Sequence, residues 1–68
     1  HGALRARATL AQAVGVVAAR FALDPDAALR RLRRAAVLGD VGLVALATAV
    51  VAREGALPAL LDVAADER

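Results

Sequence analysis

The segment Arg7–Val16, R-A-T-L-A-Q-A-V-G-V, decides how the first part of the chain folds. Apolar residues follow one another in and after it at spacings of four, three and four, which places them on one face of a helix. These residues are Leu10, Val14, Val17 and Phe21. Because no proline interrupts residues 3–22, the pattern predicts a first helix over this range, with its apolar face toward the core.

Gly15 lies in the middle of this predicted helix. A glycine there weakens a helix by roughly 1 kcal/mol relative to alanine, so we interpret it as a point of close approach by another backbone. Arg7, Gln12 and Ala13 lie off the apolar stripe, elsewhere on the helical wheel.

A second helix is predicted to begin at Asp24-Pro25-Asp26 and to run to about Leu38. An N-cap aspartate accepts a backbone N–H, proline fits the first helical position, and the second aspartate complements the helix dipole. Gly39 suits the left-handed C′ position that ends a helix, and Asp40 suits the N-cap of the next one.

A third helix is predicted from about Val41 to Arg53, ended by Glu54–Gly55. It is apolar almost all round, and so small a domain cannot easily cover both of its sides. We therefore expect this helix to contact a second copy of the chain or another domain. Its predicted core stripe consists of Leu43, Leu46, Ala47 and Val50.

The C-terminal segment begins at Pro58, which opens a short amphipathic stretch, 59–64, before the charged end Asp66–Arg68. No strand pattern is visible in the sequence. The predicted fold class is all-α: a small three-helix bundle at residues 1–53, with residues 54–68 as a C-terminal tail or short fourth helix.

Length and composition limit what stabilises such a chain. Its 68 residues form one small domain, 60% of them hydrophobic, and a core of this size rarely supplies more than about 3 to 5 kcal/mol of stability. Without Cys and with a single His, disulfides and a Cys/His zinc site are excluded. We expect self-association or a larger parent chain, and the absence of Met predicts a fragment of a longer protein.

Catalysis and membrane insertion are not indicated. There is no Ser or Cys nucleophile, His1 has no partner in a fixed element, and the carboxylates lie mainly at caps and termini. We expect a non-enzymatic domain without a cofactor or metal. The uncharged run Val41–Ala52 has twelve residues where roughly 20 are needed to span a bilayer. No signal peptide is visible, so no membrane partner and a cytoplasmic location are expected.

The second predicted helix divides into an apolar sector and an arginine sector. The apolar sector contains Ala28, Leu29, Leu32, Ala35 and Ala36, and the opposite sector contains Arg30, Arg31, Arg33 and Arg34. One interpretation is a solvated face whose long side chains cover apolar surface. The other is a phosphate-binding patch, since an arginine can hold two phosphate oxygens. No carboxylate follows Asp26 in this helix, which favours the phosphate-binding patch.

Three blocks of sequence share one register: R-A-T-L-A-Q-A-V-G-V from Arg7, D-P-D-A-A-L-R-R-L-R-R-A-A from Asp24, and L-V-A-L-A-T-A-V-V from Leu43. This pattern resembles the ANTAR domain, a small three-helix RNA-binding module of bacterial transcription antiterminators. That family reads R-x-x-I-x-Q-A-K-G, then A-F-x-x-L-R, then L-x-x-V-A. The matching residues are Arg7, Leu10, Gln12, Ala13, Gly15, Ala28, Leu32, Arg33, Ala36, Leu43, Leu46 and Ala47.

The resemblance implies an output domain that follows a receiver, GAF or PAS sensor. It implies a homodimer that binds paired RNA stem-loops in a leader transcript and so prevents a terminator hairpin from forming. Single-stranded loops offer splayed bases and phosphates to arginine. The implied RNA contacts are Arg7, Arg33 and Arg34, with Arg30 and Arg31 as candidates by location only. The implied structural motif positions are Gln12, Ala13, Gly15, Ala36 and Ala47.

Some positions depart from the family pattern. Val14 replaces a lysine, Leu29 and Ala35 replace aromatic residues, and Val41–Gly42 replaces basic or polar residues. Because base stacking on an aromatic side chain contributes roughly 1 to 3 kcal/mol, we expect weaker RNA binding than in a typical member. A second hypothesis therefore stays open: a degenerate helical module that serves dimerisation or protein–protein interaction without RNA binding.

A DNA-reading helix-turn-helix is a third hypothesis, because Gly39–Asp40 is short enough for the turn. The helix that would enter the major groove offers only Thr48 and Arg53 beyond apolar side chains. These two residues are too few to read base edges, so we set direct DNA readout aside.

Overall fold

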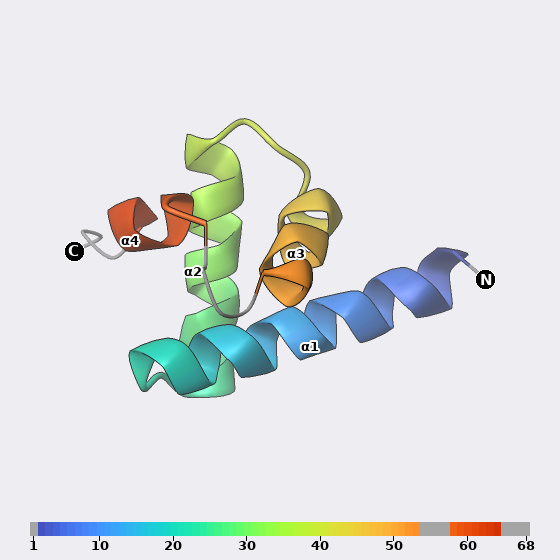
Figure 1. Ribbon diagram of the computed structural model, residues 1–68, viewed down its shortest axis with the longest axis horizontal. Helices are drawn as coiled ribbons and strands as arrows, with labels where there is room; N and C mark the ends of the chain where they lie inside the picture. Colours follow the sequence, from blue (N-terminus) through green and yellow to red (C-terminus); the bar gives the residue numbers. More distant parts are fainter. Residues whose placement is uncertain (1, 54–57, 65–68) are drawn as a thin grey trace.

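The described residues form four helices: α1 (Gly2–Phe21), α2 (Pro25–Leu38), α3 (Leu43–Ala52) and α4 (Leu60–Ala64). The computed structural model describes residues 2–53 and 58–64, and these ranges contain no strand. The predicted all-α fold class is confirmed (Figure 1). The predictions made for His1, Glu54–Gly55 and Asp66–Arg68 lie outside the described residues.

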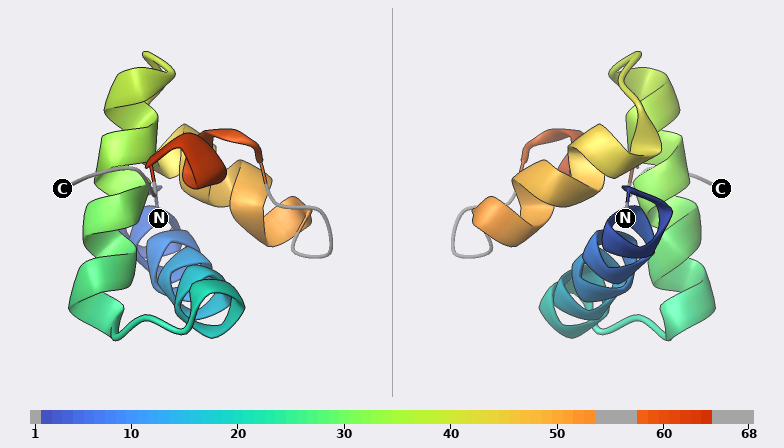
Figure 2. Two further views of the ribbon diagram at one scale, coloured as in Figure 1. Left: turned by 90° about the vertical axis from the view of Figure 1, so that its left-hand side faces the viewer. Right: turned by 90° about the vertical axis from the view of Figure 1, so that its right-hand side faces the viewer.

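Helix α2 is the element on which the others assemble. It contacts α1, α3 and α4, and α1 also contacts α3. The chain turns by 103° between α1 and α2, so that α1 crosses one end of α2, while α3 and α4 pack against α2 (Figures 1 and 2). No single helix in the described ranges is both long and apolar enough to cross a membrane, and α1 with α2 would qualify only as a pair across this bend.

The core on α1 is centred on Ala13 and Val17, which are fully buried. Leu10, Val14 and Phe21 are partly buried beside them, so the predicted apolar face is confirmed. The placement of Ala13 off this face is wrong. Two helices, α2 and α3, pack on α1, and its buried face is therefore wider than a single apolar stripe.

Gly15 does not mark a contact within the described part of the chain. It is exposed, and a Cβ added at this position would meet no heavy atom within 4 Å among the described residues. The predicted close approach of another backbone is therefore wrong for this chain. The glycine lies on the outer side of α1, where packing places no demand on its size.

The start of α2 is formed as predicted. Asp24 has an extended backbone, with φ −74° and ψ 165°, and its Oδ1 accepts a hydrogen bond of 2.7 Å from the Ala27 N–H. Pro25 occupies the first position of the helix. The buried residues of α2 are Ala28, Leu32, Ala35 and Ala36. Leu29 is half-buried, so the apolar sector is confirmed.

The end of α2 differs from the prediction. Gly39 has φ −90°, and Asp40 takes the left-handed conformation, with φ 53°. The Asp40 N–H donates to the Val37 carbonyl at 3.1 Å, and the Val41 N–H donates to the Ala36 carbonyl at 3.0 Å. This pair of bonds is a Schellman motif in which an aspartate, which tolerates the left-handed region better than most residues, occupies the C′ position.

A packing contact explains the glycine at position 39. A Cβ built there would overlap the Cδ1 atom of Leu60, so α4 packs closely on α2 at Gly39 and a larger residue would require the Leu60 side chain to move. Asp40 does not cap the next helix, which is a second correction. The N-cap of α3 is Gly42, without a side-chain hydrogen bond, and α3 begins at Leu43.

Helix α3 buries the side that the sequence predicts. Leu46, Ala47 and Val50 are buried, and Leu43 is partly buried against the same core. The opposite side exposes Val44, and the Thr48 hydroxyl donates to the Val44 carbonyl at 2.9 Å. This helix therefore keeps an apolar surface that the described part of the chain does not cover.

Helix α4 lies in the predicted C-terminal segment and packs against α2. Leu61 and Ala64 are buried in the same core cluster as Leu32 and Val50. Leu61 is one of the largest fully buried side chains. The segment after Pro58 thus contributes to the core although it is only five residues of helix.

Candidate nucleic-acid interface

Positive charge is concentrated in the first half of the chain. Residues 1–38 contain seven of the nine arginines and only two aspartates, a formal balance of +5. Residues 39–68 contain two arginines and five acidic residues, a balance of −3, which together make the net charge of +2. The small net charge is therefore the sum of a strongly basic first half and an acidic second half. This asymmetry favours contact between the first half and an anionic partner.

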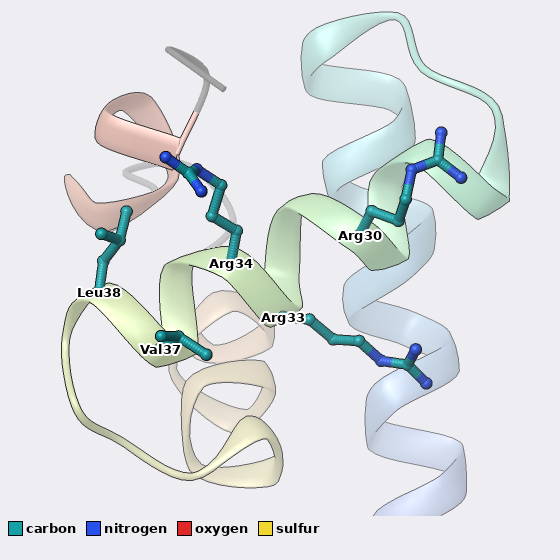
Figure 3. Close-up of a pocket in the computed structure, with 5 residues that line it drawn as sticks. All are labelled: Arg30, Arg33, Arg34, Val37 and Leu38. Carbon is teal, nitrogen blue, oxygen red and sulfur yellow. The ribbon is translucent and has the colours of Figure 1, made fainter. Parts of the chain in front are cut away.

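The exposed face of α2 carries the densest part of this charge. Its stripe follows helical spacings of three, one, three and one, so five side chains lie on one side of the helix. They line a shallow surface hollow of about 310 Å³ (Figure 3): Arg30, Arg33, Arg34, Val37 and Leu38. We call these five residues the α2 stripe. The opposite side of α2 is buried, so the stripe is held by the core.

The three arginines of the α2 stripe do not converge on one point. Figure 3 shows the Arg30 and Arg33 side chains extending toward the side on which α1 lies, whereas Arg34 extends the other way, beside Leu38. All three are exposed. Guanidinium groups spread over both flanks of a helix are suited to successive phosphates of a chain rather than to a single small anion.

Arg31 is held apart from the other arginines of α2. Its Cζ lies 4.5 Å from the centroid of the Phe21 ring, and the residue is half-buried. A cation over an aromatic face at this distance contributes about 0.5 to 1 kcal/mol. Arg31 therefore links α2 to the end of α1 and does not line the hollow.

Arg7, the remaining predicted RNA contact, is exposed on α1 and is not among the residues that line the α2 hollow. Interaction with RNA at Arg7, Arg30, Arg31, Arg33 and Arg34 stays a prediction. The structure brings Arg30, Arg33 and Arg34 together and leaves Arg7 and Arg31 outside that group.

The predicted motif positions divide into two kinds. Ala13, Ala36 and Ala47 are buried in the core, where a small side chain is needed for helices to pack. Gln12 and Gly15 are exposed on α1. Packing accounts for the three alanines and does not account for the other two, which lie on a surface that a partner can reach.

The sequence reasoning missed the apolar end of the α2 stripe. Val37 is 79% exposed and Leu38 is 46% exposed, although both fall in the last turn of an otherwise well-packed helix. A signal was present, because these residues lie three and four positions after Arg34, on the same helical face. Val41 and Val44 add to the exposed apolar surface at this end of the molecule.

Two neighbouring hollows extend this surface. One, of about 530 Å³, is lined by Arg33, Ala36, Val37, Asp40, Val41 and Leu43. The other, of about 250 Å³, lies between α3 and the start of α4 and is lined by Val41, Ala45, Leu46, Ala49, Pro58 and Leu60. Within the described ranges, no group of three or more His, Cys, Asp or Glu side chains is placed to hold a metal ion.

Together the fold and this surface define a small all-α domain with one strongly basic helix face. The sequence matches the ANTAR domain over residues 1–51, most of the 68-residue chain. The chain therefore belongs to the ANTAR family. Members of this family are RNA-binding regulatory domains of transcription antitermination, and the family is not a known enzyme family. The matched range ends within α3 and does not include α4. Comparisons with curated proteins and with solved structures found no match.

Proposed function

We propose that this chain is the RNA-binding output domain of a bacterial antitermination regulator, acting in the cytoplasm. The α2 stripe carries the proposal, because Arg30, Arg33 and Arg34 are exposed on one face of a helix that contains no carboxylate after Asp26. Such a face attracts the phosphate backbone without sequence dependence and positions the RNA. The upstream part of the regulator would be a receiver, GAF or PAS sensor.

The proposed target is a pair of stem-loops in a leader transcript, whose stabilisation prevents a terminator hairpin. Arg30, Arg33 and Arg34 would hold successive phosphates along α2. Arg7 would add a contact from α1, where it is exposed. Arg31 is the weakest of the five candidates, because its guanidinium group already lies over the Phe21 ring.

The proposal includes a homodimer, which the exposed apolar surface of the second half of the chain supports. Val44 is exposed on α3, and the 250 Å³ hollow between α3 and α4 is lined almost wholly by apolar side chains. Two copies that meet through this surface would leave both α2 stripes free and would present two RNA sites, one for each stem-loop.

The test measures the affinity for a two-hairpin leader RNA at several salt concentrations. A double variant, Arg33→Ala with Arg34→Ala, removes two of the proposed phosphate contacts. The matched control, Arg20→Ala with Arg53→Ala, removes the same charge from exposed positions away from the stripe. We expect the α2 variant to lower the slope of log affinity against log salt by roughly 1.4 to 1.8, and the control to change it much less.

Two results would contradict RNA binding by this face. One is the absence of any binding to the hairpin RNA at low salt. The other is an equal loss of affinity in the α2 variant and in the control, which would mean that only the overall charge matters.

The exposed apolar surface supports a second candidate function, a module for dimerisation or protein–protein interaction without RNA binding. Val41, Val44 and the hollow beside them provide its contact area. Sedimentation at high protein concentration distinguishes the two functions when combined with the RNA titration. A chain that stays monomeric and binds RNA excludes the second candidate, whereas a stable dimer without RNA affinity supports it.

A further inference from the structure

The α2 stripe has two chemically different ends. Its first two turns expose the guanidinium groups of Arg30, Arg33 and Arg34, and its last turn exposes Val37 and Leu38. Single exposed apolar residues are common on protein surfaces. Here, however, Val37 and Leu38 line the same hollow as the three arginines, so one ligand can touch both ends (Figure 3).

The size of the hollow limits what this ligand can be. Its volume of about 310 Å³ lies at the lower end of the range for small-ligand sites, roughly 300 to 1,000 Å³. Val37 and Leu38 lie one helical turn beyond Arg33 and Arg34, a rise of about 5.4 Å. That is the scale of a single nucleotide, with a phosphate at one end and a flat, largely apolar base face at the other.

We propose that Val37 and Leu38 contact the face of an unpaired RNA base whose phosphates are held by Arg33 and Arg34. The proposal rests on the proposed RNA binding and adds to it the part of the interface that reaches bases. In a paired stem the base faces are stacked on one another, so only a loop nucleotide can reach these side chains. Branched aliphatic side chains take here the place that an aromatic stacking residue holds in many single-strand-binding proteins.

The positive charge around the α2 stripe favours RNA over a protein as the ligand of the hollow. Residues 1–38, which contain the whole stripe, have a formal balance of +5, and α1 contains no acidic residue. A nucleic-acid strand supplies one negative charge for every nucleotide beside a base, which matches guanidinium groups that are followed along α2 by aliphatic side chains. An acidic amphipathic helix of another protein is the alternative occupant, and the experiment distinguishes it.

The experiment compares two hairpin RNAs of the same stem and the same number of phosphates, one with an intact loop and one whose loop nucleotides are abasic. The wild-type chain should bind the intact loop about ten-fold more tightly, in line with the contribution of one base contact. A double variant, Val37→Thr with Leu38→Gln, should lose most of this preference and keep its salt dependence, because it removes no phosphate contact.

The control is Leu4→Gln, the same change as Leu38→Gln at an exposed leucine of α1, outside the α2 stripe. It should keep the preference for the intact loop. A gain-of-contact variant, Val37→Trp, offers a larger stacking surface and should raise the preference by about a further five- to ten-fold. Circular dichroism and thermal unfolding confirm that each variant is folded, which is expected because the substituted side chains are exposed.

Each remaining outcome overturns the proposal in a different way. If the wild-type chain binds neither hairpin at low salt, RNA binding itself fails and the base contact fails with it. If it binds both hairpins and the double variant keeps the wild-type preference, only the base contact fails. If the double variant leaves the RNA preference unchanged and dissociates a dimer in sedimentation, the apolar end of the stripe is a protein contact.

Discussion

The two halves of this chain differ in the charge and the length of their helices. Residues 2–38 form two long helices, of 20 and 14 residues, that expose most of the arginines. Residues 39–53 and 58–64 contain two short helices, of 10 and 5 residues, whose exposed side chains are largely apolar or acidic. Yet the two halves share one core, because Leu61 of α4 and Val50 of α3 pack in the same cluster as Leu32 of α2.

This difference explains how a domain of 68 residues can expose so basic a helix. The arginine face of α2 contributes little to packing, and the residues that hold α2 in place come from α1, α3 and α4. The basic half therefore depends on the second half for its fold, whereas the second half has a net negative charge, which does not favour binding to nucleic acid. The following substitutions test that division.

The largest effect is expected from Leu61→Ala, because Leu61 is fully buried and is one of the largest side chains in the core. Replacing it should lower the free energy of unfolding by roughly 2 to 5 kcal/mol, measured by urea denaturation. That is comparable with the whole stability of a domain of this size, so the variant should be partly unfolded at 25 °C. The same change at an exposed leucine, Leu4→Ala, should alter stability by less than about 0.5 kcal/mol. An unchanged urea midpoint for Leu61→Ala would show that α4 is not part of the stable core.

A smaller loss is expected from Gly39→Ala, at the contact between the two halves. The added methyl group would overlap Leu60 Cδ1, and the backbone at φ −90° is otherwise compatible with alanine. Because the end of a leucine side chain can move, we expect a loss of about 1 kcal/mol in the free energy of unfolding.

The Leu60→Ala background provides the control for Gly39→Ala. Leu60→Ala removes the overlapping atom. In this background, Gly39→Ala should therefore lower the free energy of unfolding much less than it does in the wild type. An equal loss of stability in both backgrounds would show that the effect of Gly39→Ala does not arise from the contact with Leu60.

The opposite sign is expected for Gly15→Ala in α1. No described atom lies within 4 Å of the added methyl group, and the glycine is exposed in the middle of a helix. The substitution should raise the free energy of unfolding by about 0.5 to 1 kcal/mol, because alanine is the stronger helix former. Thermal unfolding of a dilute sample measures this. A loss of stability that appears only at high protein concentration would instead indicate that Gly15 lies in a contact between two copies.

These two glycines show how far the sequence predicts this fold. Local signals were sufficient for the helix start at Asp24 and for the buried sector of α2, since both depend on residues within one or two turns. The sequence predicts a close contact at Gly15 and a left-handed helix end at Gly39, whereas of these two glycines it is Gly39 that has the close contact, with a residue 21 positions away. No helical periodicity contains that information, and so the left-handed residue after α2 was assigned to Gly39 instead of Asp40.

The candidate site was predictable in part for the same reason. The arginine sector of α2 follows from helical spacing alone, and that spacing also reaches Val37 and Leu38. Their exposure could not be predicted, because it depends on where α3 and α4 leave α2 uncovered. The separation of Arg31 from the other arginines likewise depends on the 103° turn that brings Phe21 of α1 beneath it.

The smallest effect is expected from Arg31→Gln, which tests whether this arginine stabilises the fold or binds RNA. Losing the contact between its guanidinium group and the Phe21 ring should lower the free energy of unfolding by about 0.5 kcal/mol. The same substitution should cost nothing further in a Phe21→Leu background, where the aromatic face is absent. Its effect on RNA affinity should be clearly smaller than that of Arg34→Gln, which removes one charge from the α2 stripe. If Arg31→Gln weakens RNA binding as much as Arg34→Gln does, the guanidinium group must leave Phe21 in the complex, and the RNA surface would then extend from α2 onto the end of α1.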